Sequence, residues 1–172
     1  MIVTEAIIFS VRPILEKDIL VEAFTEKFGL IRLFAKYAQS SKPRFGGRLT
    51  TFNHLSLDVI GRSTSFTLKS AMTINSFNQL KQQFNRLAMG YKMIEVVKAI
   101  SQQGIENEPL FTLLAQALET LDKSIDPTDH LKEFYYAVLK CEGILSDGMI
   151  LNEIDYKKMI ESYTGIQLSS SL

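Results

Sequence analysis

The sequence predicts an α+β chain in two parts: a five-stranded antiparallel β-barrel over residues 1–74 and an all-α helical bundle over residues 75–172. Two observations predict this fold class. In the first half, short segments rich in β-branched and apolar residues follow one another, separated by turn residues. From residue 75 onward, apolar residues recur at steps of three and four, which is the spacing of an amphipathic helix.

The predicted strands cover residues 2–9, 18–26, 30–36, 51–60 and 65–72. Arg12-Pro13 is expected to end the first strand, because proline cannot donate a hydrogen bond to the ladder. The third strand has one apolar face, whereas its other face combines cations with an aromatic ring. That mixed face consists of Leu30, Arg32, Phe34 and Lys36. An OB barrel and an SH3-like barrel have the same number of strands, so the strand spacing leaves both open.

Four helices are expected in the second half. The first should begin at a cap on Asn75 or Ser76 and stop at Gly104. Proline is favoured in the first turn of a helix, and two further helices begin at such a residue. These are a helix starting at Glu108-Pro109 and a helix from Asp126-Pro127 to Gly143, and a last helix is expected over residues 152–163. The tail, residues 168–172, is expected to fray.

The net charge of zero hides an asymmetry between the halves. Residues 1–80 hold ten Lys/Arg and six Asp/Glu, a net +4, whereas residues 81–172 hold nine and thirteen, a net −4. No apolar run approaches the ~20 residues that span a bilayer, and the N-terminus lacks a basic stretch typical of secretory signals. These features favour a cytoplasmic protein. The single cysteine, Cys141, excludes an internal disulfide and any zinc site built on paired cysteines.

The most distinctive stretch is residues 27–57, which carries six Lys/Arg and no carboxylate, with aromatic residues interleaved. A segment of one charge sign with aromatic rings is typical of a groove that binds a phosphate backbone and stacks bases. The alternative is a solvated basic loop whose aromatic residues belong to the core. Residues 37–48 within it are predicted to form a long loop, and long loops in compact domains are often functional.

The candidate nucleic-acid-binding residues are seven cations and two aromatic residues. They are Lys17, Arg32, Lys36, Tyr37, Lys42, Arg44, Phe45, Arg48 and Arg62, of which Lys17 and Arg62 are the outer candidates. The cations would contact phosphates, and Tyr37 or Phe45 would stack a base. Phe45 has an alternative role as a loop anchor packed on the barrel. Phe34 and Phe52 are expected in the core.

Catalytic signatures are missing from the sequence, so no enzymatic activity, cofactor or metal is expected. His54 and His130 share no metal-ligand spacing with each other or with Cys141. The glycine-rich phosphate-binding motifs and the nucleophile elbow G-x-S-x-G are also missing. Cys141 is expected to be a small buried apolar residue rather than a reactive thiol.

Several short segments follow one another in a fixed order over residues 1–143. They are Arg12, Glu16–Val21, Phe24-Thr25, Gly29-Leu30, Ala35-Lys36, Ser41–Leu49, Phe52, Tyr91, Glu95 and Glu108–Leu121. Taken together, this ordered set resembles the RecO family of bacterial recombination mediators. Two departures stand out: Tyr37 replaces the glycine usual after Ala-Lys, and only Cys141 remains of the four-cysteine zinc finger that many members carry. The chain therefore resembles the short members without the finger.

The resemblance implies an N-terminal OB domain followed by a helical domain. It implies binding to single- and double-stranded DNA, annealing of complementary strands, and help in loading RecA onto DNA coated by single-stranded-DNA-binding protein. The implied partners are RecR and the acidic C-terminal tail of that coating protein. Two other functions stay open: a protein-interaction adaptor whose basic barrel docks an acidic partner, and an RNA-binding OB module.

Overall fold

The computed structural model describes residues 1–40, 44–62, 64–146 and 148–169, and the chain divides into two compact units. A barrel unit comprises residues 1–76 and 101–111, and a helical unit comprises residues 77–100 and 112–172. The first stretch of the barrel unit ends two residues beyond the boundary expected at 74/75. No pattern in residues 101–111 had indicated that they would join the barrel. Among the described residues, no helix has the length and apolarity needed to cross a membrane.

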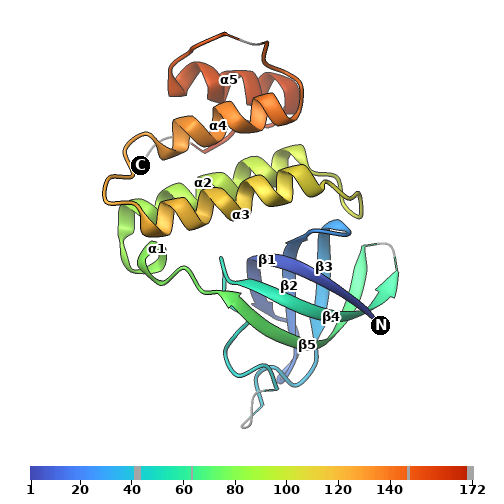
Figure 1. Ribbon diagram of the computed structural model, residues 1–172. Coiled ribbons are helices and arrows are strands. Elements are labelled where there is room, and N and C mark those ends of the chain that lie inside the picture. The colour runs from blue at the N-terminus through green and yellow to red at the C-terminus, as the bar shows by residue number, and fades with distance from the viewer. Residues whose placement is uncertain (41–43, 63, 147, 170–172) are drawn as a thin grey trace. The chain divides into compact units, whose positions relative to one another are not determined.

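The barrel consists of β1 (Ile2–Pro13), β2 (Ile19–Thr25), β3 (Gly29–Ala35), β4 (His54–Arg62) and β5 (Ser65–Asn75). These strands close in the order β1-β2-β3-β5-β4 (Figure 1). All neighbouring pairs are antiparallel except β3 and β5, which are parallel. The expectation of a fully antiparallel barrel is therefore corrected. The connection after β3 leads to β4, which pairs with β1, and β5 then turns back from β4 and lies beside β3 in the same direction. The five-stranded OB-type barrel is confirmed.

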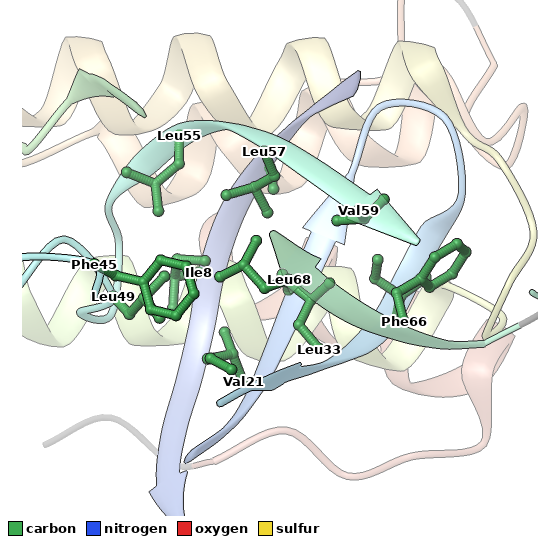
Figure 2. Packing of buried hydrophobic residues seen from close by; sticks show 14 of the residues in the cluster. Ile8, Val21, Leu33, Phe45, Leu49, Leu55, Leu57, Val59, Phe66 and Leu68 are labelled. Carbon is green, nitrogen blue, oxygen red and sulfur yellow. The ribbon is translucent and has the colours of Figure 1, made fainter. Parts of the chain in front are cut away.

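The barrel core follows the alternation of the strands. Inward-facing residues of β1 to β5 form one apolar cluster, in which Ile31, Leu33 and Ala35 represent β3. Figure 2 shows this cluster, with Phe45 and Leu49 at one end and Phe66 at the other. Pairing in β1 continues to Pro13 after a register shift between Ile8 and Ser10, so the predicted end before Arg12-Pro13 is wrong. Proline is tolerated there because the last position of a strand needs no further ladder donor.

The segment that follows helix α2 (Phe84–Ile100) packs tightly on the start of β3. Gly104 N donates to Leu30 O at 3.0 Å, and Gln103 forms isolated bridges with Gly29 and Leu30. Gly29 has φ +58°, and a Cβ there would lie 1.9 Å from Ile105 O. Only glycine satisfies both the left-handed conformation and this close approach of two backbones.

The helical unit contains α1 (Asn78–Gln82), α2 (Phe84–Ile100), α4 (His130–Cys141), α5 (Glu153–Thr164) and α3 (Glu108–Lys123) beyond its first turn. The first expected helix is in fact two helices, because Gln83 is extended at φ −110° and ψ 118°. Its N-cap residue is Phe77, not Asn75 or Ser76, and α2 ends at Ile100 rather than at Gly104. The start of α4 lies three residues after Pro127. The predicted last helix is confirmed: Asn152 accepts from Asp155 N at 2.9 Å, and Gly165 ends it with φ 69°.

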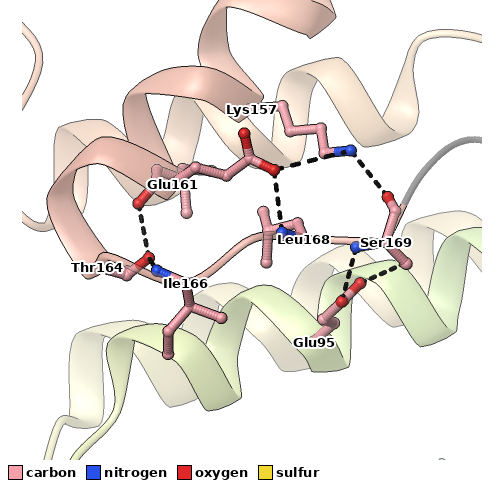
Figure 3. Close-up of polar contacts among 8 residues, drawn as sticks. Glu95, Lys157, Glu161, Thr164, Ile166, Leu168 and Ser169 are labelled. Carbon is pink, nitrogen blue, oxygen red and sulfur yellow. Dashed lines mark hydrogen bonds and ion pairs between the residues drawn. The ribbon is translucent and has the colours of Figure 1, made fainter.

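Residues 168 and 169 pack on the helical unit. Leu168 is buried, and its N–H donates to Glu161 Oε1 at 2.9 Å. Glu95 of α2 accepts hydrogen bonds from Ser169 N and Ser169 Oγ, at 2.8 and 2.6 Å (Figure 3). Lys157 Nζ donates to Ser169 O at 2.8 Å. The expected fraying is thus wrong for residues 168 and 169, while residues 170–172 lie outside the described part.

Candidate nucleic-acid interface

Two rows of outward-facing residues cross the barrel, and we call them together the outer strip. Residues opposite each other on neighbouring strands point to the same face, so the strand register defines each row. The first row is Ser10, Glu22, Arg32, Ser65 and Arg62, and the second is Arg12, Leu20, Phe34, Thr67 and Ile60. Arg32 and Arg62, which are far apart in the sequence, are thereby separated by a single strand.

The outer strip combines exposed cations with an exposed aromatic ring. Arg12, Arg32 and Arg62 are all exposed. Phe34 is 39% exposed, so its expected place in the core is wrong. The alternation places Leu33 inward and Phe34 outward, which apolar character alone cannot reveal. Glu22 is the carboxylate on the strip, and Ser10 Oγ donates to it at 3.5 Å.

Sequence reasoning missed Arg12 as a member of this surface, and it treated Phe34 in two ways, placing it on the mixed face of the third strand but also expecting it in the core. The first strand is expected to end at Arg12-Pro13, whereas β1 runs through Arg12 and pairs it with Leu20. Phe34 was assigned to the core, although it alternates with the buried Leu33 and lies two residues from Arg32. That alternation is the sequence signal that places Phe34 beside the cations, and the structure agrees with it rather than with the expected core position.

A second group of candidates lies at the barrel end beyond the last residue of β3, and we call it the barrel-end group: Lys17, Lys36, Tyr37, Arg44 and Arg48. Tyr37 N donates to Asp18 Oδ1 at 2.8 Å, and Gln39 N donates to Lys17 O at 3.0 Å. These bonds hold the β1–β2 loop against the segment that follows β3. Tyr37 has φ 60° and is 59% exposed. A left-handed conformation favours glycine, which explains why glycine is the expected residue after Ala-Lys.

The remaining loop residues surround Phe45. This side chain is 3% exposed and belongs to the barrel core, so its role is that of the loop anchor rather than of a stacking ring. Arg44 lies over the Phe45 ring at 5.5 Å and donates from Nη2 to Lys69 O at 2.9 Å. Arg48 Nη1 donates to Phe45 O at 3.0 Å. Lys42 lies outside the described residues.

The outer strip and the barrel-end group are continuous along β3. Arg32, Phe34 and Lys36 occupy successive outward positions, which span roughly 13 Å at the usual rise of a strand. In the opposite direction the face is closed. Phe24 of β2 stacks on Phe9 at 5.9 Å between ring centroids and contacts the Phe111 ring at 6.1 Å. Its neighbour on β3, Leu30, is buried beneath the segment that holds Gly104.

The other titratable candidates do not form a catalytic constellation. His54 Nε2 and Glu5 Oε2 are 2.8 Å apart, and the His54 ring lies edge-on to Phe111 at 5.8 Å. Within residues 1–40, 44–62, 64–146 and 148–169, no three His, Cys, Asp or Glu side chains gather as a metal site would require.

Cys141 is exposed at the end of α4, so the expectation of a buried residue is wrong. Its position one residue before the helix C-cap turns it away from the apolar stripe that α4 buries. Partial burial, followed by the nearby Glu142 carboxylate, raises the pKa of the thiol. A raised pKa disfavours the nucleophilic thiolate at neutral pH.

Comparison with known proteins connects this barrel with a family. Residues 1–77 match the family described as recombination protein O, N-terminal. The barrel is a RecO N-terminal domain. The predicted resemblance to RecO is thereby confirmed for the part of the chain that carries both the outer strip and the barrel-end group.

Longer matches extend beyond the barrel. A DNA repair protein RecO from Geobacter metallireducens is 28% identical over 134 residues, covering 78% of this chain and 54% of the relative. One from Anaeromyxobacter sp. (strain K) is 30% identical, covering 76% and 52%. One from Trichodesmium erythraeum is 34% identical, covering 75% and 45%. The chain thus spans about half the length of the curated relatives it matches.

Proposed function

We propose that this chain binds DNA in recombinational repair, using the outer strip and the barrel-end group as its contact surface. The observation that carries the proposal is the outer strip, where three arginines and an exposed aromatic ring share one face of an OB-type barrel. Barrels of this type bind oligonucleotides on the face of strands 2 and 3. Similarity to proteins named DNA repair protein RecO supports the role in repair.

The finer proposal follows from the resemblance to RecO. According to this proposal, the chain binds single- and double-stranded DNA in the cytoplasm and anneals complementary strands. It acts with RecR to help RecA load onto DNA coated by single-stranded-DNA-binding protein. The acidic C-terminal tail of that coating protein is a further proposed partner, and the chemistry needs no cofactor.

The physical basis of annealing is charge neutralisation. Two approaching DNA strands repel each other through their phosphates. A surface that pairs phosphates with arginine and lysine releases condensed counterions and lowers this repulsion, so complementary strands meet more often. The contacts are made with the backbone, and binding through them should therefore depend on salt more than on sequence.

The test is fluorescence anisotropy of the whole chain with labelled oligo-dT over a series of salt concentrations. The proposal predicts binding at low salt, with log K falling by about 0.7 per phosphate contact for each unit of log salt and a total slope of several contacts. Binding that is absent even at low salt would contradict it and favour the adaptor with an acidic protein partner. A clear preference for structured RNA would favour the RNA-binding module instead.

A further inference from the structure

Phosphate binding by the surrounding cations does not explain why Phe34 is exposed among them. It lies in the middle of the outer strip, 39% exposed, with Leu20 opposite it on β2 and Thr67 opposite it on β5. Leu20 is only 8% exposed, so the side chain beside the Phe34 ring is apolar and largely shielded from solvent. A phosphate gains nothing from an apolar ring, whereas the flat face of a base does.

The cations around Phe34 are spaced to hold the backbone on either side of it. Arg32 is the neighbouring outward position on β3, and Lys36 directly follows the last residue of that strand; each lies roughly 7 Å from Phe34 along the chain. Arg62 shares the row of Arg32 through Ser65, and Arg12 shares the row of Phe34 through Leu20. Cationic residues therefore flank the position of Phe34 along the chain and within the two rows.

The packed segment at residues 101–111 fixes where the path of a bound strand ends. It covers Leu30 and Phe24, the outward pair next to Glu22 and Arg32. A bound strand therefore crosses Arg32 and Phe34 and continues toward Lys36 and Tyr37. Tyr37 supplies a second exposed ring along the same direction.

We propose that Phe34 stacks on an unpaired base, and that this contact makes the outer strip prefer single-stranded over duplex DNA. The inference rests on the proposed DNA binding and deepens it. In a duplex, each base is stacked between its neighbours, so a ring on the face of a strand reaches a base only after unstacking. In a single strand, the base faces are accessible, and stacking on an aromatic side chain tolerates any sequence.

The first test replaces the ring by an aliphatic side chain. Phe34→Leu should weaken binding to oligo-dT about tenfold or more, the order expected for one lost base stack, and leave duplex affinity within about twofold. The slope of log K against log salt should stay unchanged, because no phosphate contact is removed. Equal losses for oligo-dT and duplex, or no loss for oligo-dT, would overturn the inference.

The second test reports the contact directly and does not depend on the leucine variant. The chain has no tryptophan, so Phe34→Trp introduces one fluorophore at the site. Its emission should be quenched on addition of oligo-dT, with affinity kept or raised. The matched control is Met72→Trp, at an exposed position of β5 outside the outer strip, whose emission should not change. An unquenched Phe34→Trp that still binds oligo-dT would refute stacking, whereas a wild-type chain that binds neither DNA would refute the proposed function itself.

Discussion

Arg86 is expected to be among the most important single residues for the stability of the helical unit. It lies in the first turn of α2, is 7% exposed, and caps the end of α3. Its Nη1 donates to Leu121 O at 2.6 Å and to Asp122 O at 3.0 Å, and its Nη2 donates to Ser124 O at 2.6 Å. Nε donates to Gln83 Oε1 at 2.6 Å, beside the break between α1 and α2.

These contacts have two separate physical effects. The last carbonyls of a helix have no partner within the helix, and Arg86 supplies donors to two of them. Its positive charge also lies at the negative end of the α3 dipole, which is a favourable position for a cation. Losing the guanidinium therefore leaves buried carbonyls without their donors and removes a favourable charge.

Arg86→Met keeps most of the aliphatic volume and removes every donor. Charge-assisted hydrogen bonds contribute about 1.5–3 kcal/mol each. Removing the buried charge also removes its desolvation cost, which offsets part of the lost hydrogen-bond energy. We expect the free energy of unfolding of the helical unit to fall by about 3 kcal/mol. Arg86→Lys keeps the charge but cannot reach all three carbonyls, so we expect roughly half that loss.

Urea unfolding followed by far-UV circular dichroism measures the effect, since helices dominate that signal. Lys158→Met is the matched control, because it removes a cation from an exposed position of α5. We expect the control to stay within ~0.5 kcal/mol of wild type, as exposed substitutions usually do. An Arg86→Met variant that is as stable as the control would refute the capping argument.

Three further predictions concern the barrel, the helical unit and the surface. Gly29→Ala should lower the stability of the barrel by at least ~2 kcal/mol in thermal unfolding, because its new Cβ would lie 1.9 Å from a backbone oxygen. Gly47→Ala is the control, because Gly47 has φ +75° but nothing within 4 Å of its Cβ position; this variant should lower the stability by only ~1 kcal/mol. Burial, and then three nearby carboxylates, raise the pKa of the Tyr135 hydroxyl above its usual 10.0, so the folded state favours the neutral phenol. The stabilisation that Tyr135 contributes is therefore complete below pH 10 and is lost as the pH rises above 10. Tyr135→Phe should reduce this loss of stability at alkaline pH, and a pH profile of urea midpoints that stays unchanged in the variant would contradict the prediction. Replacing Arg32 and Arg62 together by alanine should reduce the salt slope for oligo-dT by ~1.4, and an unchanged slope would remove both residues from the contact surface.

Much of the candidate surface could be predicted from the sequence because the relevant signals are local. The excess of cations over residues 27–57 required only counting, and it correctly drew attention to β3 and the loop that follows it. The alternation within residues 30–36 correctly separated the face of Ile31 and Leu33 from the face of Arg32. The alternation along a strand does not identify the strands that pair with it. The row that joins Arg32 to Arg62 therefore could not be predicted from the sequence.

The sequence by itself determined the number of strands, the faces that alternate along them, and the helical nature of the second half. These depend on the period of the chain, which is the same wherever an element finally packs. The tertiary structure decided the parallel pairing of β3 with β5, the burial of Phe45 and the packing of residues 101–111 on the barrel. Each depends on contacts between residues far apart in the chain. Whether the side chain of a loop residue such as Phe45 is buried depends on what packs beside it, and its own sequence neighbours do not contain that information.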